Sequence, residues 1–206
     1  MKLSFSSFLP VVGALAVLGS TSCNILPAPT EDLTKFYVLS TLTPTTDIAT
    51  SGVSVGIKQV SVAGYLSHHD IVVRSGDNEI DFKDQARWAE PVDTGVARVV
   101  RSRLIASPGI THAYLPPLPL EGQRDYDVLI DVIRCEGVKS STGFVASFAA
   151  VIEIHKSGST DDIGVRKVFQ AEDKTWDGHD YGKLVGLLSE DVEALGSAVA
   201  DAIPKK

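Results

Sequence analysis

Residues 144–154 carry an apolar side chain at every second position, and this pattern constrains the fold more than any other. The apolar positions are Phe144, Ala146, Phe148, Ala150, Ile152 and Ile154. Ser147, Glu153 and His155 fall on the opposite side. Because successive side chains of a strand point to opposite faces, the segment predicts a long strand with one buried face. A sheet that is buried on one face only is typically antiparallel.

The segments on either side of this strand extend the pattern. Residues 126–132 place Tyr126, Val128, Ile130 and Val132 on one face and two aspartates, Asp127 and Asp131, on the other. After a polar loop at residues 157–162, a third long strand is expected through Val165, Phe169 and Ala171. A turn is expected over residues 137–143, between two glycines. Three strands joined by short polar turns predict an antiparallel meander.

Two segments have the spacing of amphipathic helices. Pro91 suits the first position of a helix, and apolar residues then recur at Val92, Val96, Val99, Val100 and Leu104. A longer stripe closes before Pro204 and consists of Tyr181, Leu184, Val185, Leu188, Val192, Leu195 and Val199. Both stripes are wide enough to bury one face of a helix against a sheet.

Shorter strands are expected in the first half of the chain. They cover residues 35–40, residues 51–62, a hairpin formed by residues 70–75 and 79–82, and residues 110–115. With the meander and the two helices, this order predicts the α+β class. We expect a two-layer sandwich, a largely antiparallel sheet with two main helices packed on one face.

The N-terminus has the pattern of an export signal. Lys2 is followed by a short apolar run over residues 8–18 and by small residues before Cys23. The run is too short for a spanning helix, which needs about 20 residues, so residues 1–22 predict a cleaved signal peptide. The small residues and Cys23 resemble the lipobox of bacterial lipoproteins, with Ser20 in place of the usual leucine. The alternative is an ordinary signal peptide with Cys23 as a free or disulfide-bonded thiol.

The resemblance implies lipidation of Cys23 by fatty acyl chains such as palmitate. Residues 23–34 then form a lipidated flexible tether, and residues 35–206 form a single domain. Asn24 after the cysteine, where aspartate often marks retention in the inner membrane, favours the periplasmic face of the outer membrane over the inner membrane.

Composition and spacing disfavour several functions. A net charge of −7 disfavours nucleic-acid binding, which rewards clustered Lys and Arg. The chain has no nucleophile elbow and no phosphate-binding glycine pattern, and His68 and His69 are adjacent, which in an extended segment points them apart. We therefore expect no catalytic residues, no metal ligands and no cofactor, and hence no enzyme. Cys135 lies in a strand segment and is expected to be a buried structural residue.

Arg87, Trp88 and Glu90 stand out immediately before the first helix. A tryptophan beside a helix start can fix the entry of the chain as a core aromatic residue. It can also anchor a partner subunit, because Trp and Arg are enriched at the centres of interfaces. We keep both interpretations and treat Arg87, Trp88 and Glu90 as the candidate partner interface.

An ordered series of short segments resembles the ABC-type transport auxiliary lipoprotein family, which includes paraquat-inducible protein C. The segments lie within residues 53–104 and include 55–60, 71–80 and 87–91; residues 36–39 also match. The resemblance implies a membrane-anchored, non-enzymatic periplasmic component of a transport system that carries phospholipids across the envelope. The implied partners are an ABC transporter and a mammalian-cell-entry (MCE) domain protein, with homo-oligomerisation also expected. The alternative is a stand-alone lipoprotein that holds a small apolar ligand between the sheet and the helices, in a cavity lined by Phe144, Phe148 and Leu188.

Overall fold

The computed structural model describes residues 31–41, 49–120, 123–159 and 163–204. Residues 34–206 belong to one compact unit. Its elements follow the order β1 (Lys35–Tyr37), β2 (Val53–Val62), the short 3-10 helix η1 (Gly64–Ser67), β3 (Asp70–Arg74), β4 (Ile80–Trp88), α1 (Val92–Ile105), β5 (Ile110–Tyr114), β6 (Tyr126–Ser140), β7 (Gly143–Lys156), β8 (Ile163–Gln170), β9 (Lys174–Trp176) and α2 (Tyr181–Ala202).

The predicted meander is confirmed and forms the centre of the sheet. β7 pairs antiparallel with β6 and with β8. The apolar residues of β7 from Ala146 to Ile154 are buried at every second position, as the period of two requires. The turn expected over residues 137–143 is wrong in extent, because β6 continues to Ser140 and Gly143 already begins β7. Gly137 therefore lies inside β6. A side chain at this position would meet the Trp176 ring at about 3.0 Å, which explains the glycine.

The sheet is mixed, with parallel pairs beside the antiparallel meander. The N-terminal half of β6 pairs in parallel with β2, and its C-terminal half pairs in parallel with β3. The change of partner coincides with an irregularity in β6, where Val132 and Arg134 face consecutive residues of β7 and Ile133 is left over. The Tyr65 hydroxyl donates to the Ile133 carbonyl at 3.1 Å. Thus η1 fills the junction at which the sheet divides.

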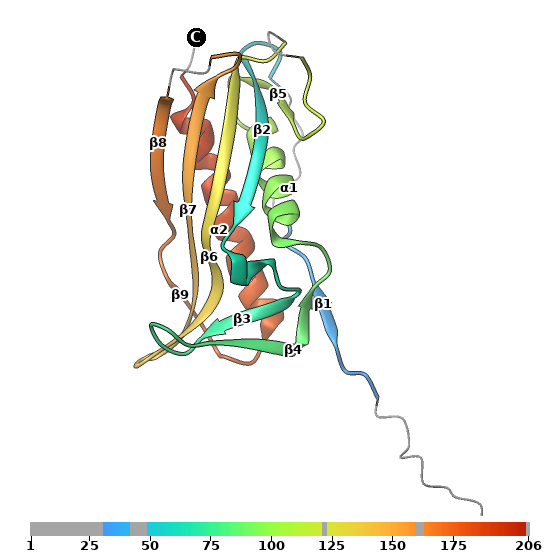
Figure 1. Cartoon of the computed structure of the whole chain (residues 1–206), viewed down its shortest axis with the longest axis vertical. Coiled ribbons are helices and arrows are strands. Elements are labelled where there is room, and N and C mark those ends of the chain that lie inside the picture. The colour runs from blue at the N-terminus through green and yellow to red at the C-terminus, as the bar shows by residue number, and fades with distance from the viewer. Residues whose placement is uncertain (1–30, 42–48, 121–122, 160–162, 205–206) are drawn as a thin grey trace, which may run out of the picture. The chain divides into compact units, whose positions relative to one another are not determined.

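Both helices cover one face of this sheet, as predicted (Figure 1). α1 lies on β2 and β5, and α2 lies on the β6–β9 side. All five residues of the predicted α1 stripe are buried. In α2 the stripe from Leu184 to Val199 is buried as well. The α+β class is therefore confirmed. One boundary moves by a residue, since α1 begins at Val92 and Pro91 is its N-cap residue.

The segment after β1 is fixed between the two helices. Leu39 is buried and lies against Gly95 of α1. A Cβ atom added to Gly95 would lie 3.3 Å from the Leu39 side chain. The Leu39 carbonyl accepts a hydrogen bond from Arg98 of α1 at 2.6 Å. The Ser40 amide donates to Ser189 of α2 at 3.0 Å. The N-terminal end of the domain is therefore held rigidly against the helical layer.

Candidate interaction surfaces

The predicted lipidation site, Cys23, lies outside the described residues, as do the signal peptide and most of the predicted tether. Lipidation of Cys23 stays a prediction. Among the residues that the structure describes, no helix is long and apolar enough to cross a membrane.

Trp88, the central residue of the predicted partner interface, is the last residue of β4 and is only 5 % exposed. Its backbone amide donates to the His69 carbonyl at 2.7 Å, which aligns it at the end of the β3–β4 pair. The side chain belongs to the main hydrophobic core. The structure thus places Trp88 where a core aromatic residue is expected, and a partner can reach only its neighbours directly.

Arg87 and Glu90 flank Trp88 and are accessible, and each is held by an ion pair. The Arg87 side chain donates from Nε to Asp70 Oδ1 at 2.9 Å. Glu90 accepts from Arg98 of α1, whose guanidinium also binds the Leu39 carbonyl. These pairs connect β4, α1 and the segment after β1. They orient two charged side chains on the surface without burying them.

The structure brings an exposed aromatic residue next to this cluster that sequence reasoning did not identify. β1 pairs in parallel with β4, with Phe36 opposite Arg87 and Tyr37 opposite Trp88. Tyr37 and Trp88 therefore share the core face, whereas Phe36 and Arg87 share the outer face. Phe36 is 63 % exposed and Val38 is 47 % exposed. No sequence signal separates Phe36 from the buried aromatic residues, because its exposure depends on the edge position of β1.

A shallow groove lies across β2, β6, β7 and β8, with a volume of about 250 Å³. Leu129 and Val151 contribute apolar surface to it, and Asp131, Glu153 and Arg166 contribute charge. Arg166 donates to Glu153 at 3.1 Å, and Asp131 accepts from Ser61 at 2.8 Å. A groove with this much charge on its walls suits a polar contact better than the acyl chains of a lipid.

Two clusters with a buried carboxylate connect elements of the fold through ion pairs. Glu136 is fully buried and accepts two hydrogen bonds from Arg74, at 2.6 and 3.2 Å. The Arg74 guanidinium lies 5.4 Å from the centre of the Tyr65 ring. Burial, followed by the Glu136 charge, raises the pKa of the Tyr65 hydroxyl to about 12. The cluster locks η1 and β3 onto β6, and its tyrosine stays neutral at physiological pH.

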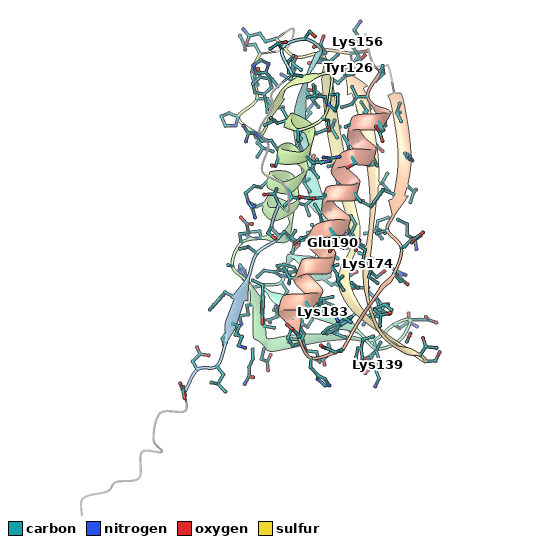
Figure 2. All side chains as sticks on the ribbon, turned by 180° about the vertical axis from the view of Figure 1, so that it is seen from behind. Tyr126, Lys139, Lys156, Lys174, Lys183 and Glu190 are labelled. Carbon is teal, nitrogen blue, oxygen red and sulfur yellow. The ribbon has the colours of Figure 1, made fainter. Side chains whose placement is uncertain are left out.

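The second group joins β9 to α2 (Figure 2). Lys174 of β9 binds Glu190 at 2.8 Å and the buried Asp191 at 2.9 Å. Burial raises the pKa of the Asp191 carboxyl, although Lys174 acts in the opposite direction. Asp191 Oδ2 has no hydrogen-bond partner among the described residues. Lys174 therefore fastens the short strand β9 to the helical layer.

The remaining residue types that could carry chemistry are dispersed. Cys135 is buried, as predicted, and burial raises the pKa of its thiol to about 12. His68 lies 3.3 Å from Asp70, while the His69 carbonyl accepts from the Trp88 amide. No group of three or more His, Cys, Asp or Glu side chains able to hold a metal ion occurs in the described ranges.

Comparison with known proteins identifies a family and solved structures with a similar fold. A family model described as "ABC-type transport auxiliary lipoprotein component" matches residues 37–200, from β1 to α2. A crystal structure of an uncharacterized protein has a TM-score of 0.65 and 17 % identity, covering 83 % of this chain and 99 % of that one. Protein XCC0632 from Xanthomonas campestris has a TM-score of 0.65 and 16 % identity, covering 81 % and 92 %. At these identities the two structures support the fold alone. No curated protein matches.

Proposed function

Since the chain belongs to the ABC-type transport auxiliary lipoprotein family, we propose that it is a non-enzymatic docking component of a lipid-transport system in the cell envelope. In this proposal acyl chains on Cys23 hold residues 35–206 at the periplasmic face of the outer membrane. The partners are an MCE-domain protein, its ABC transporter and other copies of this chain. The cargo is phospholipid, which cannot cross water freely because each exposed CH₂ costs about 0.8 kcal/mol.

The family match over residues 37–200 carries this proposal, and the packing of the core supports it. A stand-alone carrier would need a cavity between the sheet and α2, lined by Phe144, Phe148 and Leu188. Phe148 and Leu188 are fully buried, and the Phe148 ring packs edge-on against Phe169 at 6.2 Å. The Phe144 ring packs in the same way against Trp176 at 5.7 Å. These contacts fill the space that an apolar ligand would need.

In this proposal Arg87, Trp88 and Glu90 form the partner-contact region, with different roles because only Trp88 is buried. Arg87 and Glu90 make the contact, and Trp88 supports them from the core. A charged contact of this kind chiefly sets specificity and orientation.

Co-purification from detergent-solubilised envelopes tests the partner. The expected result is recovery of an MCE-domain protein with the tagged full-length chain, and loss of that protein when Arg87 and Glu90 are both replaced by alanine. A chain that is recovered as a monomer with bound lipid, and without any MCE-domain protein, would establish the stand-alone carrier instead.

Intact-mass measurement of the exported protein tests the anchor. The expected product begins at Cys23 and carries the added mass of a diacylglyceryl group and a fatty acid. Replacement of Cys23 by serine should abolish that mass, whereas Cys135→Ser, the matched control in the buried strand β6, should keep it. An unmodified thiol on the exported chain refutes the anchor.

A further inference from the structure

Phe36 and Val38 form an exposed apolar strip on one side of the first described strand. They alternate with Tyr37, which faces the core, and with Leu39, which is buried. Beside this apolar strip lies Arg87 of β4, which is opposite Phe36. Arg87 forms an ion pair with Asp70 of β3. Among the described residues β1 pairs with β4 alone, so it lies at an edge of the sheet (Figure 1). In the described ranges neither another strand nor a helix covers Phe36, whose side chain is 63 % exposed.

The strip is held in a fixed orientation. The Ala89 amide donates to the Tyr37 carbonyl at 2.8 Å, which extends the β1–β4 pairing beyond Phe36. Arg98 and Ser189 bind the backbone of Leu39 and Ser40 from the two helices. An exposed side chain on a mobile terminus can turn away from water, but this backbone is pinned on both sides of Val38. The apolar strip is therefore a permanent feature of the surface.

The position of the strip in the sequence indicates what covers it. Phe36 follows Cys23 by thirteen residues, which span at most about 45 Å when fully extended. If Cys23 is acylated, the segment between Cys23 and Phe36 is short enough to keep the strip within reach of the bilayer. The chain is acidic, with a net charge of −7, so charge does not draw it onto an anionic leaflet. Apolar insertion can hold such a domain against the membrane where charge cannot.

We propose that Phe36 and Val38 seat in the interface between lipid headgroups and acyl chains, and that this contact orients the domain on the membrane. The inference rests on the proposed lipid anchor at Cys23. The anchor supplies proximity, and the strip supplies orientation. The neighbouring Arg87 then lies at the edge of the bilayer, where it meets a partner that approaches along the membrane surface.

Site-specific fluorescence in vesicles tests this inference. The full-length lipoprotein carrying Phe36→Trp is reconstituted in vesicles of phosphatidylethanolamine and phosphatidylglycerol with brominated acyl chains. Val168→Trp is the matched control, because Val168 is 64 % exposed on the distant edge strand β8. The native Trp88 and Trp176 are buried and give both variants the same background. The expected result is a blue-shifted emission and strong quenching for Phe36→Trp, with neither change for Val168→Trp.

Three outcomes would overturn the seating of the strip, and they are distinguishable. Equal quenching of the two variants in floating vesicles refutes the strip while leaving the anchor intact. A blue shift of Phe36→Trp that appears only when the MCE-domain protein is added in detergent assigns the strip to a protein contact. Failure of both variants to float with the vesicles refutes the anchor, and the strip with it.

Discussion

Replacing Trp88 by alanine separates the two interpretations of residues 87–90. Trp88 is 5 % exposed and packs in the core at the end of β4. Truncation of a buried Trp typically costs about 3–5 kcal/mol of unfolding free energy, because the apolar contacts are lost and a cavity remains. For a domain of this size, 1 kcal/mol lowers the melting temperature by about 2–4 °C. The expected loss is therefore about 6–20 °C.

The assay combines thermal unfolding with partner recovery at a temperature where the variant is still folded. Under those conditions Trp88→Ala should keep the recovery of the proposed MCE-domain partner, because in the proposed contact region Trp88 only supports Arg87 and Glu90 from the core. Arg87→Ala is the control in the adjacent residue. Its ion pair with Asp70 is partly exposed, so removal should cost only about 0–1 kcal/mol. That variant should weaken partner binding with little change in melting temperature.

One result would refute this reasoning. If Trp88→Ala melts within about 2 °C of the native protein, a shift worth less than roughly 1 kcal/mol, and yet loses its partner, then Trp88 is an exposed anchor in solution. The buried position of Trp88 at the end of β4 would then not be the state that binds the partner.

Further tests in α2, at the buried Arg74–Glu136 pair and at Cys135 have defined outcomes. In α2, Gly186→Ala should stabilise the protein by about 0.5–1 kcal/mol because the position is open. Gly196→Ala should destabilise it, since the added carbon would lie 2.8 Å from Arg103 Cβ of α1. Urea unfolding should therefore show changes of opposite sign in the unfolding free energy of the two variants. Arg74→Ala leaves the Glu136 carboxylate buried without its partner and should cost about 3–5 kcal/mol, most of which the double variant Arg74→Met/Glu136→Leu should recover. With a thiol pKa of about 12, Cys135 should resist a thiol reagent at pH 8 until the chain is unfolded in denaturant; rapid labelling of the native protein would contradict its burial.

Local periodicity predicted the elements whose stability comes from one buried face. The β7 strand and the α2 helix each carry a long apolar repeat, and both were correctly assigned. β9 was missed because three residues contain no period, and the strand exists only through its pairing with β7 and the bond from Lys174 to α2. The parallel pairing of β6 with β2 and β3 was missed as well. Alternation specifies which face of a strand is buried, but it does not specify the neighbouring strand or its direction.

The candidate interface could be predicted in part for the same reason. The sequence marks residues 87–90 as an unusual group of aromatic and charged side chains, and the structure places them together at the start of α1. Whether an aromatic residue near this group is exposed depends on the face of the sheet that it takes and on the neighbours of its strand. Trp88 takes the core side of β4, a strand that has neighbours on both edges. Phe36 lies on the outer face of β1, which pairs with β4 alone among the described strands, and its side chain is 63 % exposed.

An exposed phenylalanine beside a pinned backbone is unfavourable in water, because apolar surface costs about 25 cal/mol per Å². Scattered exposed apolar residues are common, but Phe36 and Val38 lie on one side of the segment, and Arg98 and Ser189 bind the backbone of the next two residues, Leu39 and Ser40. The same bonds would transmit any force on the N-terminal segment directly to the helical layer. An anchor at Cys23 that pulled on a loose terminus could not orient the domain, whereas a pinned strand that also contacts the bilayer can. If Cys23 is acylated as proposed, these hydrogen bonds therefore favour an N-terminal strand that orients the domain on the membrane.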